Sequence, residues 1–124
     1  MLYFTIFYIF AQKKEMKLSA ENFNFGEALE HLKNGLAVTR HGWEDNMFVV
    51  KQINSDIDES VIPHMTSLPQ KVKELILQTE CKSISYQQQC IIVHITENGN
   101  IATNYIPNWI DMFADDWTIV EDIV

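Results

Sequence analysis

The chain has 124 residues, of which 47% are hydrophobic and 21% charged, as in a typical soluble globular protein. This length is typical of one domain and is enough for a real hydrophobic core, so no disulfide is needed to hold it together. The formal net charge of −8 excludes general binding to DNA or RNA polymers, which requires a basic surface, but a local site could still hold a small anion.

The N-terminus begins with ten largely apolar residues, 2–11. They are too few to span a bilayer, which takes about 20 residues, and the basic pair Lys13-Lys14 follows them, whereas a signal peptide has its basic residues first. We therefore expect Met16 to be the true start, residues 1–15 to be a dispensable extension, and residues 16–124 to form a single domain. A signal or anchor is one alternative, and an edge strand or dimer contact is another.

A helix is predicted over residues 25–34. Asn24 and Glu27 have the spacing of an N-terminal capping box, and Gly35 is suited to the left-handed position that follows a helix. The apolar residues repeat at the spacing of one helix face: Phe25, Ala28, Leu29 and Leu32.

The next elements are a predicted hairpin and a second helix. Strands are expected over 36–40 and 47–53, joined by a turn, and a polar loop over 54–66. Ser67 then has the position of an N-cap for a helix over about 69–79. The inner face of that helix is expected to consist of Val72, Leu75, Ile76 and Thr79.

A second hairpin is the clearest β signal. Residues 89–96 are expected to form a strand with a well-buried apolar centre, and residues 101–106 the return strand. Between them, Asn98-Gly99 favours a type I′ turn, which needs two residues with positive φ.

The remaining segments complete the predicted fold. Residues 81–88 read as an irregular connection, 107–114 as a short helical turn and 117–120 as the last strand. Together, all the predicted elements give an α+β fold: an antiparallel sheet of about five strands, two main helices and a short helical turn before the last strand. Cys81 and Cys90 are expected to be free thiols.

Three carboxylates near the C-terminus could form a site: Asp111, Asp115 and Asp116. A metal would need several oxygen ligands that converge, which the sequence does not establish. The alternatives are binding of a hydroxyl or amine of a ligand, or ordinary solvent, cap and turn roles. The four histidines are scattered, and their spacing does not match a zinc site. We predict no metal, no cofactor and no catalytic residue.

The block Arg40-His-Gly-Trp43 is the second candidate. Arg40 is the only arginine and could clamp a phosphate, and Trp43 could stack on a base. In the alternative interpretation, Trp43 fills the core beneath the turn and Arg40 pairs with a nearby carboxylate. Trp109 and Trp117 are expected to be core residues rather than ligand platforms.

Three segments together carry a resemblance to a known family. They are Asn24-Phe-Gly-Glu-Ala-Leu29, Val38-Thr-Arg-His-Gly-Trp43 and Asp111-Met-Phe-Ala-Asp-Asp-Trp117. In this order they resemble the second Thoeris anti-defence family of phage and prophage proteins, over residues 23 to 122. The chain departs from that family in a longer segment over 54–88 and in Trp109, where many members have a small polar residue.

The resemblance implies a sponge and not an enzyme. Such a protein binds a cyclic ADP-ribose-type signal, holds it unmodified in the bacterial host cytoplasm and so keeps an anti-phage effector inactive. Some relatives also bind cyclic oligonucleotides at separate sites. The resemblance further implies a homo-oligomer, a tetramer with ligand pockets between subunits. We expect neither a membrane nor a DNA or RNA polymer as a partner.

Carried over residue by residue, the resemblance gives four candidate ligand contacts. Trp43 falls on the base-stacking tryptophan of the family, with Arg40 in the same block, and Asp116 and Asn104 fall where the family has polar contacts. We add Asn108 and Asp111, which lie near Asp116 in the sequence, as two further candidates, so the predicted set has six residues. Two other functions remain open at this stage: a protein-interaction or phage accessory module without a nucleotide ligand, and an enzyme acting on a nucleotide.

Overall fold

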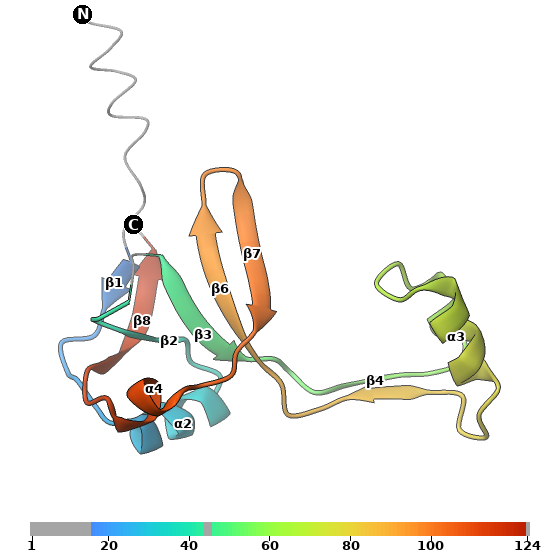
Figure 1. Cartoon of the computed structure of the whole chain (residues 1–124), viewed down its shortest axis with the longest axis horizontal. Helices are drawn as coiled ribbons and strands as arrows, with labels where there is room; N and C mark the ends of the chain where they lie inside the picture. The colour runs from blue at the N-terminus through green and yellow to red at the C-terminus, as the bar shows by residue number, and fades with distance from the viewer. Residues whose placement is uncertain (1–15, 44–45, 124) are drawn as a thin grey trace, which may run out of the picture. The chain divides into compact units, whose positions relative to one another are not determined.

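The computed structural model describes residues 16–43 and 46–123, which belong to two compact units. Unit 1 consists of the chain up to Lys51 and from Cys90 onward, and unit 2 of Gln52–Gln89 (Figure 1). The interpretation of residues 1–15 as a dispensable extension lies outside the described residues. The boundary of a single domain at 16–124 stays a prediction.

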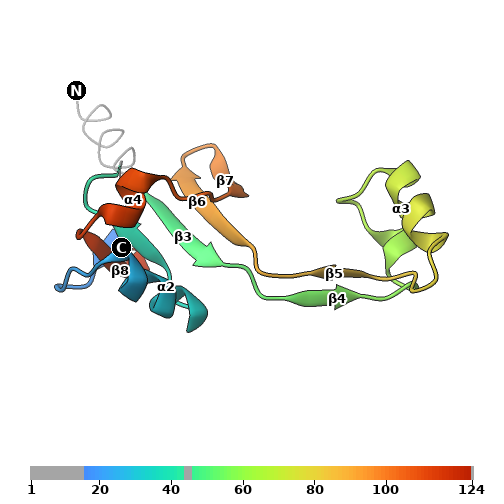
Figure 2. The same ribbon diagram turned by 60° about the horizontal axis from the view of Figure 1, so that its bottom comes forward.

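Unit 1 is built on a six-stranded antiparallel sheet with the strand order β1-β8-β2-β3-β6-β7. Its strands are β1 (Met16–Leu18), β2 (Val38–Arg40), β3 (Met47–Lys51), β6 (Cys90–Thr96), β7 (Gly99–Asn104) and β8 (Trp117–Ile123). The described residues of the same unit contain two helices, α2 (Phe25–Lys33) and the five-residue α4 (Trp109–Phe113) (Figure 2). The predicted α+β class is thereby confirmed. The sequence did not predict β1, which is only three residues long and is a strand because it pairs with β8.

Helix α2 begins and ends where the sequence predicted. The backbone N–H of Glu27 donates to Asn24 Oδ1 at 2.9 Å, and the Asn24 N–H donates to Glu27 Oε1 at 3.3 Å, which completes the capping box. At the other end Gly35 has φ +83°, the left-handed conformation that glycine adopts without strain. These local signals fix the ends of the helix before any tertiary contact is considered.

Replacing the cap should therefore have a modest and specific effect. We expect Asn24→Ala to lower the free energy of unfolding by about 1 kcal/mol, because one N–H of the first turn loses its acceptor. Asn24→Asp keeps the acceptor and serves as the control. The urea unfolding midpoint measures both, and equal midpoints for the alanine variant and the parent protein would contradict the assignment.

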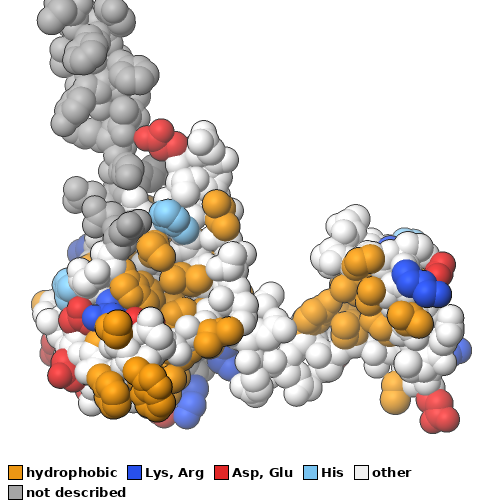
Figure 3. All heavy atoms as spheres, in the orientation of Figure 1, with side chains coloured by type: hydrophobic (Ala, Val, Ile, Leu, Met, Phe, Trp, Pro, Cys, Tyr) orange, Lys and Arg blue, Asp and Glu red, His pale blue; other side chains and the backbone are white. Residues whose placement is uncertain are grey.

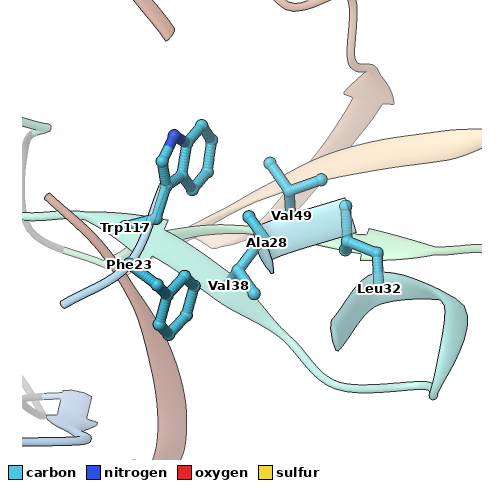
Figure 4. Packing of buried hydrophobic residues seen from close by; sticks show 6 residues of the cluster. All are labelled: Phe23, Ala28, Leu32, Val38, Val49 and Trp117. Carbon is cyan, nitrogen blue, oxygen red and sulfur yellow. The ribbon is translucent and has the colours of Figure 1, made fainter. Parts of the chain in front are cut away.

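The core of unit 1 lies between α2 and the sheet. Figure 4 shows side chains from the helix and from strands β2, β3 and β8 pointing toward one another. Trp117 is the largest of them and is only 1% exposed. The buried cluster consists of Phe23, Ala28, Leu32, Val38, Val49 and Trp117.

The β6–β7 hairpin is confirmed, but two details of its prediction are wrong. The strands pair from Thr96↔Gly99 to Ile91↔Asn104, so the loop is Glu97-Asn98. Neither loop residue has positive φ, which rules out a type I′ turn. The positive φ of this hairpin is at Gly99 (+132°), the first residue of the return strand. The centre of β6 is also half-buried rather than fully buried; helix α2 packs mainly against β2, β3 and β8.

Unit 2 contains a two-stranded antiparallel sheet that the sequence did not predict. Strands β4 (Ser55–Ile57) and β5 (Ile84–Tyr86) lie side by side (Figure 2), in segments expected to be a polar loop and an irregular connection. Each strand has only three residues, too few for a pattern of alternation, so pairing decides their conformation. Between them lie a 3-10 turn, η1 (Ile62–His64), and helix α3 (Gln70–Leu77).

The second helix is confirmed, but its predicted cap and inner face are wrong. Pro69, in an extended conformation, occupies the N-cap position, and no side chain caps the helix. The buried residue is Lys73, whose Nζ donates to the carbonyl oxygens of Pro63 at 3.3 Å and Met65 at 2.9 Å. These two hydrogen bonds compensate the desolvation of the ammonium group. The expected inner residues Val72, Leu75 and Thr79 are exposed instead, and Ile76 is half-buried.

None of the helices in the described residues is both long enough and apolar enough to cross a membrane.

Candidate functional site

Strand pairing brings Arg40 and Asp116 together from positions 76 residues apart. Arg40 ends β2 and lies opposite Trp117, the first residue of β8, so the preceding Asp116 lies beside it. Arg40 Nε donates to Asp116 Oδ1 at 2.8 Å and Nη2 donates to Oδ2 at 3.4 Å. The backbone N–H of Gly42 donates to the same Oδ2 at 3.1 Å. The result is a bidentate ion pair whose carboxylate also accepts a hydrogen bond from the turn that follows β2.

Helix α4 adds a second carboxylate to this pair. The side chain of Asn108 caps the helix by accepting from the N–H of Asp111 at 2.8 Å. Asp111 Oδ1 accepts from Arg40 Nη1 at 2.9 Å, and its Oδ2 accepts from the hydroxyl of Tyr105 at 3.0 Å. The carbonyl of Asp111 accepts from Trp117 Nε1 at 2.9 Å. Arg40, Tyr105, Asp111 and Asp116 thus form one network, which we call the Arg40 network.

The network holds one guanidinium and two carboxylates, and these side chains differ in their access to solvent. The side chains of Arg40 and Asp111 are 14% and 9% exposed, whereas that of Asp116 is 32% exposed. Hydrogen bonding from Arg40 lowers the pKa of Asp116 below its usual value, so Asp116 is ionised at neutral pH. Burial raises the pKa of Tyr105, and its hydrogen bond to Asp111 raises it further, so the phenol stays protonated and donates.

Aromatic rings lie directly against the network. Trp43 is half-buried and meets Trp117 edge-on at 5.2 Å between ring centroids. It meets Tyr105 in a similar geometry at 5.9 Å. These contacts hold the indole of Trp43 in place, because edge-to-face pairs at such distances are favourable.

The structure therefore brings five of the six predicted contacts into one neighbourhood. Arg40, Asp111 and Asp116 bond to one another, Asn108 bonds to Asp111, and Trp43 packs against Tyr105 and Trp117. Asn104 is the sixth and is exposed at the end of β7, the edge strand of the sheet, next to Tyr105 in the chain.

The structure differs from the sequence-based expectations at Tyr105 and at Trp109. Tyr105 was not among the predicted site residues, although its position next to Asn104 and six residues before Asp111 was a usable signal. Trp109 was expected in the core but is 70% exposed on α4. The side chain of Arg40 forms ion pairs with Asp111 and Asp116, as the alternative interpretation of the sequence predicted. In the described ranges, no group of three or more histidine, cysteine or acidic side chains is placed to hold a metal ion.

The fold and this network define a small α+β domain whose polar and aromatic residues meet where β2, α4 and β8 converge. The family of Tad2-like proteins, described as the Thoeris anti-defense 2-like domain, matches residues 23–120. This match covers most of the chain and includes the Arg40 network, so the chain belongs to the Tad2-like Thoeris anti-defence family. No curated protein matches the chain at a significant level.

Proposed function

We propose that this protein binds and sequesters a cyclic ADP-ribose-type signalling nucleotide in the bacterial host cytoplasm without cleaving it. The observation that carries the proposal is the family match over residues 23–120. An anti-defence protein that acts by sequestration needs affinity for a signal, and it needs no stabilisation of a transition state.

The geometry supports distinct roles for the candidate residues. Trp43 is held edge-on by two neighbouring rings and is half-buried, so part of its surface is available to a base. Asp116 is more exposed than Arg40 and Asp111, and its ionised carboxylate can accept a hydrogen bond from a ribose hydroxyl or an exocyclic amine. Arg40 and Asp111 are mostly buried and neutralise each other, so we assign them to positioning Asp116 and α4 rather than to holding a phosphate directly.

One stacked base contributes only about 1–3 kcal/mol, whereas nanomolar affinity requires about −12 kcal/mol. The rest must come from enclosure of the ligand and from further hydrogen bonds. Asn108, which caps α4 at Asp111, and Asn104, which precedes Tyr105 in the chain, are exposed polar groups of the required kind. A pocket shared between subunits would supply the enclosure, and we therefore include a homotetramer in the proposal. Cyclic oligonucleotides are a second ligand class that separate sites could take.

Removal of the Trp43 ring tests the proposal. We expect Trp43→Ala to weaken binding of the preferred cyclic ADP-ribose isomer by about 1–3 kcal/mol, a factor of roughly 5 to 150, since one base stack is lost. Trp43→Phe keeps a ring and should retain most of the affinity. Isothermal calorimetry measures both variants, and near-ultraviolet circular dichroism shows whether each remains folded, since Trp43 also contacts Trp117.

Three results would contradict the proposal. The first is a parent protein whose melting temperature no cyclic ADP-ribose isomer raises, because a bound ligand must stabilise the folded state. The second is a folded Trp43→Ala variant that binds as tightly as the parent protein. The third concerns cleavage: the ligand recovered after denaturing the complex should have its original mass, and a changed mass would indicate an enzyme.

A further inference from the structure

Two aromatic rings hold the indole of Trp43, and both are anchored to the same residue. Trp43 meets the ring of Trp117 at 5.2 Å and the ring of Tyr105 at 5.9 Å between centroids, edge-on in both cases. Trp117 Nε1 donates to the carbonyl oxygen of Asp111 at 2.9 Å, and the Tyr105 hydroxyl donates to Asp111 Oδ2 at 3.0 Å. Asp111 therefore anchors both surfaces against which the indole lies.

The two rings differ in how strongly the rest of the fold fixes them. Trp117 begins β8, forms a backbone bridge with Phe23 and is only 1% exposed, so packing alone fixes its ring. Tyr105 is half-buried and lies between β7 and α4, outside both elements. Its backbone N–H donates to the carbonyl oxygen of Cys90 at 2.9 Å, and its hydroxyl donates to Asp111. The orientation of the Tyr105 ring therefore depends more on its hydroxyl than that of Trp117 depends on its indole N–H.

Tyr105 also joins the aromatic side of the site to its charged side. Figure 3 shows hydrophobic side chains next to basic and acidic ones on one face of unit 1. The Tyr105 ring contacts Trp43, and its hydroxyl bonds to Asp111, whose other carboxylate oxygen accepts from Arg40. Arg40 in turn donates to Asp116. Trp43 and Asp116, the two side chains proposed to touch the ligand, thus lie at the ends of one chain of contacts.

A stacking ring contributes most to affinity when it is already in its binding orientation. Fixing Trp43 in advance removes the entropy cost of ordering its side chain when the ligand binds. The hydroxyl of Tyr105 is suited to this task, because burial raises the pKa of Tyr105 and keeps the phenol protonated and able to donate.

We propose that Tyr105 is a positioning residue of the ligand site: its hydroxyl, held by Asp111, fixes the ring against which Trp43 is oriented for stacking on a nucleobase. The inference rests on the proposed function, because it takes Trp43 to be the stacking residue. It adds a role for a residue outside the six predicted contacts. Tyr105 acts through Trp43 and needs no contact with the ligand.

Tyr105→Phe tests this role, because it removes the hydroxyl and keeps the ring and the backbone hydrogen bond. Tyr105→Leu removes the ring as well. The matched control is Tyr86→Phe, which removes the hydroxyl of a half-buried tyrosine on β5 in unit 2. Far-ultraviolet circular dichroism of the ligand-free protein detects the exciton coupling between the indoles of Trp43 and Trp117, and Trp43→Ala gives the spectrum without this pair. Isothermal calorimetry with the cyclic ADP-ribose isomers measures affinity.

We expect Tyr105→Phe to reduce the exciton signal and to weaken binding by a factor of about 2 to 12, the effect of one hydrogen bond. Tyr105→Leu should reduce both further, and Tyr86→Phe should change neither. In a Trp43→Ala background, Tyr105→Phe should cause no additional loss of affinity, because the ring that it orients is absent. A residue that contacted the ligand directly would add its own loss in that background.

An exciton signal or an affinity that stays at the parental value in folded Tyr105→Phe and Tyr105→Leu would overturn this inference and leave the proposed function intact. A further loss of affinity in the Trp43→Ala background would also overturn it, because Tyr105 would then act independently of Trp43. A parent protein that binds no isomer would overturn the proposed function instead. The exciton signal would then still decide whether Tyr105 orients Trp43, because that measurement uses no ligand.

Discussion

Trp117→Ala should unfold the protein or leave it barely stable. Trp117 is the largest buried side chain of unit 1, packs against Phe25 and Trp43, and donates its Nε1–H to the carbonyl of Asp111. Truncating a buried tryptophan costs about 3–5 kcal/mol, out of a total stability of roughly 5–15 kcal/mol. Urea unfolding followed by far-ultraviolet circular dichroism measures the loss.

Two further variants separate the causes of this effect. Trp117→Phe retains most of the apolar volume but leaves the Asp111 carbonyl without its donor, so we expect a smaller loss of about 1–3 kcal/mol. Trp43→Ala removes a half-buried ring and should also lower the free energy of unfolding less than Trp117→Ala does. If Trp43→Ala proves the more damaging of the two alanine variants, then Trp43 rather than Trp117 is the central ring of the core.

Arg40→Ala should also be strongly destabilising. It leaves the buried carboxylate of Asp111 with the Tyr105 hydroxyl as its remaining donor, and it removes the partner of Asp116. Breaking a buried ion pair from one side costs about 3–5 kcal/mol, and since Asp116 is 32% exposed we expect about 2–4 kcal/mol here.

The matched control is Lys33→Ala. Lys33 pairs with Glu30 at 3.0 Å, but both side chains are about two-thirds exposed, and pairs of this kind contribute about 0–1 kcal/mol. The urea unfolding midpoint at neutral pH compares the two variants. Similar small shifts in both would show that the Arg40 network contributes no more than a surface ion pair.

The same network should make stability depend on acid pH. The pKa of Asp116 is lower in the folded protein than in the unfolded chain, mainly because of its hydrogen bond from Arg40. The resulting stabilisation is fully present above the unfolded pKa of about 3.9 and is lost as the pH falls through the lower, folded value. Arg40→Ala removes the cause of the shift, so urea midpoints measured below about pH 4 should fall less steeply in the variant than in the parent.

Local signals in the sequence were sufficient for the elements that stabilise themselves. Helix α2 was predicted from its capping box, its apolar spacing and Gly35, because all three act within a few residues of one another. The β6–β7 hairpin was predicted for the same reason. The class of fold followed from the order of these elements.

Short strands and the faces of helices depended on distant partners. Strands β1, β4 and β5 have three residues each, and only their pairing across the chain makes them strands. On α3, apolar spacing pointed to Val72 and Leu75, but Lys73 is buried because the carbonyls of Pro63 and Met65 accept its protons. Lys73 has a charged end, so the sequence of its own helix gave no sign that it would be buried.

The sequence by itself indicated most residues of the site, Tyr105 excepted, and it also carried the family resemblance, through the blocks around Arg40–Trp43 and Asp111–Trp117. Tertiary structure alone decided what each of them contacts. The pairing of β2 with β8 sets Asp116 against Arg40, and on α4 Asp111 is buried while Trp109 and Phe113 are exposed. A tryptophan in the core and a tryptophan on the surface have the same chemistry, so only the elements packed around each one distinguish Trp117 from Trp109.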